Sequence, residues 1–178
     1  MGRIRRLLIT FTIALLVSFF LWKWLGDDGE QAGVITANLN EAETFLTEST
    51  TLKEGESLQV EHLLKSEDSS LRVAAYTIRQ SGQTSKQGVA VFESLDDHRM
   101  EFVKTTTTKE KTIFEQVMKS GKLYGIFLTS REDWEEAIIH IEGVGEFTFS
   151  RTNQPIQAEL IELSEASEPQ VYEIQFDR

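Results

Sequence analysis

A long run of apolar residues opens the pattern of hydrophobic and polar positions along the chain. Residues 7–25 form a stretch of 19 residues in which Lys23 is the one ionisable side chain. Because a helix rises about 1.5 Å per residue, this run is about long enough to cross the roughly 30 Å hydrocarbon core of a membrane. Trp22 and Trp24, on either side of Lys23, suit the headgroup region at its far end. We therefore expect residues 7–25 to span a membrane.

Two interpretations of this segment compete. A cleaved secretory signal has a shorter apolar core, followed by small residues at its cleavage site. Here the core is long, and Trp22, Lys23 and Trp24 stand where the small residues would have to be. We therefore favour an uncleaved signal anchor and keep the cleaved signal as the alternative.

The charges beside the apolar run predict its orientation. Arg3, Arg5 and Arg6 come before it, whereas Asp27 and Asp28 come after it. Basic residues that flank a spanning helix stay on the cytoplasmic side. The amino terminus is therefore expected in the cytoplasm and the remainder of the chain on the outer side of the cell membrane.

The next change of pattern marks a linker and then a helix. Residues 26–37 are acidic and glycine-rich without any period, which is typical of a linker. Asn38 is a good N-cap with Glu41 as its capping-box partner, and apolar residues then recur at spacings of three and four. This stripe can continue to Leu52, and Gly55 is well placed to end the helix in a left-handed conformation. The pattern predicts one amphipathic helix between Asn38 and Gly55.

Beyond Gly55 the period changes to about two, and turn residues separate short runs of β-forming side chains. Close spacing and tight turns favour an antiparallel meander. The front half of residues 132–141 could equally begin a helix. The expected strands cover residues 58–64, 71–79, 88–93, 99–107, 111–118, 122–129, 134–142, 146–151, 156–163 and 171–176.

These elements predict an α+β fold that is mostly antiparallel β. The amphipathic helix is expected to pack on the meander, and a second β-rich unit is expected to follow. Residues 38–178 would form the soluble domain, with 38–108 and 109–178 as its possible subunits. A chain of that size buries enough surface to fold without covalent staples.

One hairpin carries a resemblance to known proteins. Residues 88–93 read GVAVFE, and residues 73–76 of the expected partner strand read VAAY. Together with the order of anchor, helix, hairpin and β-rich unit, this resembles small, mostly uncharacterised membrane-anchored exported proteins of Gram-positive bacteria. The resemblance is architectural, covers residues 38–142 and carries no catalytic residue. It implies an anchored domain on the outer side of the membrane.

Composition adds a strong asymmetry of charge. The 178 residues include 18 basic and 29 acidic side chains, a net charge of −11, and no cysteine. Residues 26–178 hold all 29 carboxylates and 14 of the cations, which leaves that part at −15. Such a field repels phosphate groups and argues against nucleic-acid binding. The lack of cysteine excludes disulfides, thiol nucleophiles and thiolate zinc sites, and it fits a Gram-positive cell surface.

The side chains that usually carry chemistry form no known motif. His62, His98 and His140 are not spaced as metal ligands, and no acidic run has the pattern of a calcium-binding loop. No nucleophile elbow or phosphate-binding loop is present. A pair of carboxylates able to cleave glycosides depends on the fold and is not visible in a sequence. We therefore expect no metal and no cofactor, and we expect the protein not to be an enzyme.

Two features could bind a partner. The threonines between Lys104 and Lys109 could form a strand edge that accepts a partner strand, or a solvated strand end protected by the two lysines. Trp134 lies between acidic residues and could be an exposed anchor, although burial in the core is the more common fate of tryptophan. The candidate partner-binding residues are Trp134, Thr105, Thr106, Thr107 and Thr108.

These observations give three hypotheses about function. The first is a single-pass, membrane-anchored domain without enzymatic activity that binds an envelope protein or senses its envelope surroundings. The second is a cell-envelope hydrolase that uses paired carboxylates. The third is a structural membrane component that acts through residues 7–25.

Overall fold

The computed structural model describes residues 33–68, 70–164 and 168–177. The chain divides into two units, residues 1–33 and 34–178, and the described residues belong almost entirely to the second. The membrane-spanning segment expected at residues 7–25 lies outside the described residues. Within the described part, no helix combines the length and the apolar character that a membrane crossing requires.

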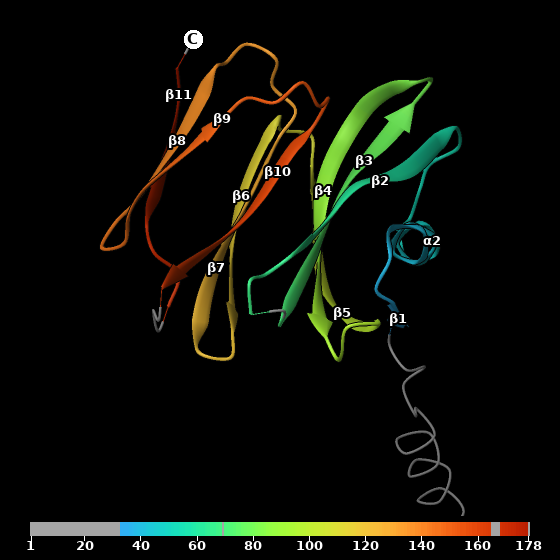
Figure 1. Ribbon diagram of the computed structural model, residues 1–178. Helices are drawn as coiled ribbons and strands as arrows, with labels where there is room; N and C mark the ends of the chain where they lie inside the picture. Colours follow the sequence, from blue (N-terminus) through green and yellow to red (C-terminus); the bar gives the residue numbers. More distant parts are fainter. Residues whose placement is uncertain (1–32, 69, 165–167, 178) are drawn as a thin grey trace, which may run out of the picture. The chain divides into compact units, whose positions relative to one another are not determined.

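The second unit contains antiparallel strands and, in its described part, one short helix (Figure 1). This confirms the prediction of a mostly antiparallel β fold with one helix. The elements are β1 (Val34–Thr36), α2 (Leu39–Ser49), β2 (Glu56–Lys65), β3 (Leu71–Gln80), β4 (Gln83–Ser94), β5 (Arg99–Thr108), β6 (Thr112–Lys119), β7 (Lys122–Thr129), β8 (Glu136–Ile141), β9 (Gly145–Ser150), β10 (Gln157–Ser164) and β11 (Tyr172–Asp177).

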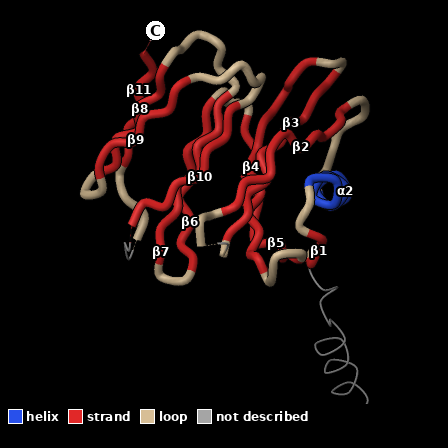
Figure 2. Tube along the Cα trace, in the orientation of Figure 1, coloured by secondary structure: helices blue, strands red, loops and turns tan. Residues whose placement is uncertain are grey.

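The strands form three sheets (Figure 2). The first sheet has the order β1-β5-β4-β3-β2, the second β10-β7-β6, and the third β11-β8-β9. Helix α2 packs on one face of the first sheet, and the second sheet packs on the other. The third sheet covers the far face of the second. Both the first and the second sheet are therefore buried on two faces.

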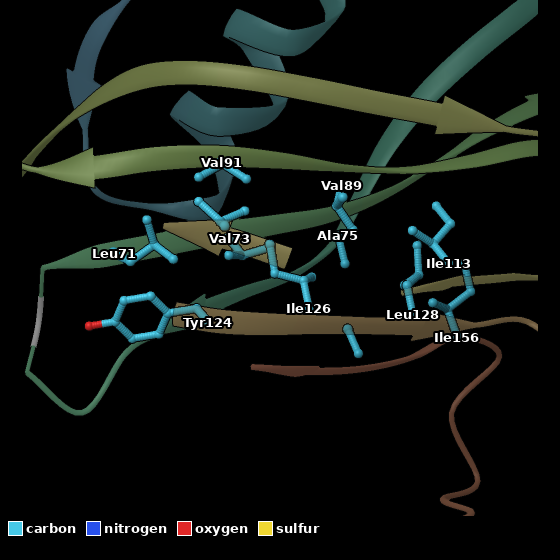
Figure 3. Close-up of a cluster of buried hydrophobic side chains, with 12 residues drawn as sticks. Leu71, Val73, Ala75, Val89, Val91, Ile113, Tyr124, Ile126, Leu128 and Ile156 are labelled. Atoms are coloured by element: carbon cyan, nitrogen blue, oxygen red, sulfur yellow. The ribbon is translucent and has the colours of Figure 1, made fainter. Parts of the chain in front are cut away.

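Alternating side chains along the strands build these layers. In β3, Val73 and Ala75 point toward the second sheet, where they meet Ile126 of β7 (Figure 3), whereas Tyr76 packs under α2. In β7, Phe127 contacts the third sheet, on the face opposite to Ile126. A strand buried on both faces needs apolar residues at almost every position. This explains why β3 and β7 are continuous apolar runs.

Helix α2 begins as the sequence predicts. The side-chain oxygen of Asn38 accepts a hydrogen bond from the backbone N–H of Glu41 at 2.9 Å, and Ala42 and Leu46 are fully buried against the first sheet. Its predicted end is wrong, because the helix stops at Ser49. The next residue, Thr50, is extended.

The early end of α2 has a local cause. The residues after Leu46 include serine and three threonines, which are poor helix formers. Leu52 packs against the core from an irregular segment instead of from a helix. Gly55 is left-handed, with φ of 78°, but it belongs to the turn that leads into β2.

The clearest differences from the expected strands are a strand that was not expected, a start of β4 at Gln83 instead of residue 88, and the outcome for the ambiguous segment 132–141. Strand β1 lies within residues 26–37, for which the sequence gives no periodic pattern, and it pairs with Arg99–Glu101 of β5. The ambiguous segment 132–141 forms strand β8 from Glu136 onward, and its front half is not helical.

Candidate partner-binding edge

The outer edge of β5 is covered over only part of its length. Strand β1 pairs only with Arg99–Glu101, and its first residue, Val34, lies opposite Glu101, so among the described residues the rest of β5 has β4 as its one neighbouring strand. A bulge follows, because Val91 of β4 pairs with Lys104 whereas Phe92 pairs with Phe102. From Lys104 to Thr108 the pairing with β4 is regular, and we call these five residues the free edge.

The direction of the backbone groups in the free edge follows from its contact with β4. A Cβ placed on Gly88 of β4 would lie 2.6 Å from the carbonyl oxygen of Thr106, so this oxygen faces β4. Backbone groups of successive residues alternate between the two sides of a strand. The N–H and C=O groups of Thr105 and Thr107 therefore point away from β4, toward the free edge.

Side-chain contacts hold this strand in place from both faces of the sheet. The buried hydroxyl of Tyr76 lies 2.8 Å from Oγ1 of Thr105 and 2.5 Å from Oγ1 of Thr107. Lys104 forms an ion pair with Glu115 of β6. The backbone groups at the free edge are therefore ordered before any partner arrives, which lowers the entropic cost of binding.

At two other sheet edges, side chains form hydrogen bonds with backbone groups of the edge strand, and the free edge has no such bonds from the described residues. On β2, Glu43 of α2 accepts a hydrogen bond from the backbone N–H of Val60 at 2.8 Å. On β6, the Tyr172 hydroxyl donates a hydrogen bond to the backbone carbonyl oxygen of Phe114 at 3.3 Å. Such cover blocks the addition of another strand. No bond of this kind reaches the backbone of the free edge from the described residues.

Trp134 lies in the core and not on the surface. It is 3% exposed, its ring packs edge-on against Phe127 and Phe176, and its Nε1 donates to the carbonyl oxygen of Arg131 at 3.0 Å. The structure thus selects the core interpretation and contradicts an exposed anchor. Trp134 lies between the second and third sheets, whereas the four threonines belong to the first sheet, so the two candidate features do not form one site.

The three histidines lie apart and serve separate local roles. His62 of β2 has its Nε2 3.0 Å from the carbonyl oxygen of Ile156, and His140 of β8 lies 3.4 Å from Glu146. His98 is in the turn before β5. Within residues 33–68, 70–164 and 168–177, no group of three or more possible ligand side chains could hold a metal ion.

The structure also reveals a polar cluster around Asp68, in the turn between β2 and β3. The Asp68 carboxylate accepts hydrogen bonds from the Tyr124 hydroxyl at 2.7 Å, from the Ser66 hydroxyl at 2.7 Å and from the backbone N–H of Ser70 at 3.0 Å. These donors, Tyr124 first, hold the pKa of Asp68 well below its usual range. Burial in turn raises the pKa of the Tyr124 hydroxyl.

The Asp68 cluster borders a cavity of about 290 Å³, which Tyr124 lines. A carboxylate with a lowered pKa is ionised at neutral pH and has no proton to donate. Its hydrogen bonds join the first sheet to the second, so the Asp68 cluster stabilises the packing of these two sheets. The sequence indicates a turn at this position but gives no sign of a partner 56 residues further along the chain.

Comparisons with protein-family models, with curated proteins and with solved structures find no match to this chain.

Proposed function

We propose that the protein is a single-pass, membrane-anchored domain on the outer side of the cell membrane that binds an extended segment of an envelope protein. The bound segment would add to the first sheet at the free edge, Lys104–Thr108. The observation that carries this proposal is a regular strand edge whose outward backbone groups, at Thr105 and Thr107, have no cover among the described residues. The apolar run at residues 7–25 and the charges around it support the anchor and its orientation.

Strand addition at this edge would form a small set of backbone hydrogen bonds. Two residues with outward N–H and C=O groups offer four bonds to a neighbouring strand. At about 1 kcal/mol net for each bond, four bonds correspond to a dissociation constant on the order of 1 mM. Side-chain contacts next to the edge must therefore supply the rest of the affinity and the specificity.

Three acidic side chains are unsuited to the acid step of glycoside hydrolysis. Hydrogen bonds lower the pKa of three carboxyls: Glu56 chiefly through the backbone N–H of Lys53, Asp68 chiefly through Tyr124, and Asp96 chiefly through Arg99. A general acid that cleaves a glycosidic bond needs the opposite shift. These three carboxyls are therefore suited to structural contacts.

Photocrosslinking in intact cells tests the proposal. A p-benzoylphenylalanine in place of Val103, which is 50% exposed beside the free edge, would react with a bound partner. We expect a discrete crosslinked product with the full-length chain. Thr107→Pro removes the outward N–H together with the hydroxyl and should abolish this product, whereas Thr107→Ala removes the hydroxyl and methyl groups but keeps the N–H and should retain the product.

Two results would contradict the proposal. One is a crosslinked product of equal yield in the Thr107→Pro and Thr107→Ala variants, which would place the partner elsewhere. The other is a result in which residues 34–178 resist protease added to whole cells but are digested once the cells are lysed. That result would place this part of the chain in the cytoplasm. Circular dichroism of both variants checks that each one is folded.

A further inference from the structure

A groove with lysines in its wall lies where the free edge ends. Thr108, the last residue of the free edge, pairs with Gln87 of β4. Gln87 and Lys109, the next residue of the chain, both line a groove of about 380 Å³. Ser130 and Pro155, which flank strands of the second sheet, also line it. A segment added along the free edge would therefore reach this groove if it extended beyond Thr108.

The lining of the groove has a formal charge of +1, whereas residues 26–178 together carry −15. Lys86, Lys109 and Lys111 line it, and we call it the lysine groove. The Lys86 ammonium lies 3.2 Å from Glu56, whereas Lys109 and Lys111 form no ion pair with any described residue. Two carboxylates, Glu110 and Glu132, also belong to the lining.

The free edge that leads to the groove carries no carboxylate. No acidic residue occurs from Phe102 to Lys109, although residues 26–178 carry 29 carboxylates and a net charge of −15. Charges that are not paired within a protein attract a ligand of opposite sign. The combination of free edge and lysine groove therefore favours an extended ligand with negative charge at the end that passes Thr108.

Gln87 holds the wall of the groove in place. Gln87 is only 2% exposed. Its Nε2 donates a hydrogen bond to the carbonyl oxygen of Glu110 at 2.8 Å, whereas its Oε1 has no hydrogen-bond partner among the described residues. Buried acceptors without a partner are rare in native proteins. This oxygen is also out of contact with solvent, so it belongs to the wall of the groove and makes no claim on the ligand.

We propose that the lysine groove binds the acidic end of the extended segment that adds to the free edge. The partner is then a peptide in which a short β-forming stretch is followed or preceded by carboxylate side chains. This inference rests on the proposed function, because the free edge must hold the β-forming stretch for the carboxylates to reach Lys109 and Lys111.

Fluorescence anisotropy with three labelled peptides tests this inference on the full-length chain in neutral detergent. All three share a Thr-Val-Thr-Val-Thr core, which carries two glutamates before it, two glutamates after it, or two lysines before it. We expect one acidic peptide to bind at least about tenfold more tightly than the lysine peptide. The chain has a net charge of −11, so overall electrostatics would give the opposite order.

The better acidic peptide also reports the direction of the added strand. An antiparallel strand has its amino-terminal end beside Thr108, so it should prefer the glutamates before the core. A parallel strand should prefer the glutamates after the core. Either preference supports the inference, whereas equal binding of all three peptides overturns it.

A matched pair of variants localises the effect. Lys109→Glu in the lysine groove and Lys65→Glu, on β2 outside the groove, change the net charge equally. We expect Lys109→Glu to weaken the acidic peptide by about fivefold or more, and Lys65→Glu by less than about twofold. Equal losses, or no binding of the acidic peptides up to about 1 mM, would overturn the inference.

Thr107→Pro separates this inference from the proposed function. If all three peptides bind equally and Thr107→Pro abolishes the binding of each, strand addition stands and the acidic preference is wrong. If Lys109→Glu weakens an acidic peptide but Thr107→Pro does not, compared with Thr107→Ala, the groove binds acids without the free edge. That result overturns both the joint site and the proposed strand addition.

Discussion

Asp68 fastens two layers of the fold with one side chain. It belongs to a turn of the first sheet, and its carboxylate accepts a hydrogen bond from Tyr124 of the second sheet as well as bonds from its own turn. Lys122 lies 3.6 Å from the same carboxylate. Because these partners stabilise the ionised form, the pKa of Asp68 is lower in the folded chain than in the unfolded chain.

This shift predicts a pH-dependent stability. A lowered folded-state pKa contributes stability above the unfolded-state pKa of about 3.8, and that contribution is lost as the pH falls toward the folded-state pKa. Asp68→Asn should therefore lower the free energy of unfolding at pH 7 by about 1–2 kcal/mol and by less at about pH 3. Urea unfolding of both chains at the two pH values measures this. An equal difference at both would contradict it.

Single residues were the hardest feature to predict from sequence. The cap at Asn38 depends on a neighbour three positions away and is confirmed. The partner of Asp68 and the burial of Trp134 depend on residues brought together by tertiary packing, which leave no local pattern. The four threonines show a polar strand end in the sequence, but the fact that no described strand covers them depends on how short the pairing of β1 with β5 is.

At the scale of elements, β4 lies so close to its neighbouring strands at Gly88 that a side chain does not fit there. A Cβ at this position would lie 2.4 Å from Cζ of Tyr76 and 2.6 Å from the backbone oxygen of Thr106. Tyr76 is fully buried, so its ring has little space to move away. Only a residue without a side chain lets β4 run beneath this tyrosine and remain paired with the free edge.

Gly88→Ala should therefore lower the free energy of unfolding by about 2 kcal/mol, which corresponds to several degrees in Tm. Thermal unfolding followed by circular dichroism measures the change. Tyr76→Leu provides the control, because the same Gly88→Ala change should be less costly once the ring is absent. An unchanged Tm in the Gly88→Ala chain would show that β4 tolerates the extra atom.

Most strands could be predicted because apolar alternation and turn residues mark their ends. Strand β7 begins and ends where the sequence predicts it, at residues 122–129. Strand β1 was missed because three residues are too few to show a period. The end of α2 was misplaced because Leu52 continues the apolar stripe although the helix has already ended at Ser49.

At the scale of the whole molecule, the three hydrophobic cores share strands. Strand β7 contributes Ile126 to the core between the first and second sheets and Phe127 to the core between the second and third. Strand β3 likewise serves both faces of the first sheet. Layers that share strands are expected to unfold together.

Ile126→Ala tests this coupling. Loss of a buried isoleucine should lower the free energy of unfolding by about 3 kcal/mol. With Trp22 and Trp24 replaced by phenylalanine, fluorescence comes from Trp134, which lies in the core beyond Ile126. We expect the fluorescence and circular dichroism transitions to shift by the same amount. A fluorescence transition that stays in place would show that the third sheet unfolds independently.

The arrangement of layers could not be predicted from sequence. A strand with apolar residues on both sides requires cover on both faces, but its pattern does not say which sheet supplies each cover. The sequence predicted a second β-rich unit after residue 108, and the structure divides that region into two stacked sheets. Stacking was not predictable because it depends on contacts between residues far apart in the chain.

Because the second sheet is buried on both faces, the solubility of the chain depends on the two sheets that cover it. Without the first sheet on one side and strands β8, β9 and β11 of the third sheet on the other, β6, β7 and β10 would form a sheet that is apolar on both faces. Sheets of that kind stack on one another and precipitate. The first and third sheets thus shield the apolar faces of the second sheet, and a fragment that lacks either of them should be insoluble.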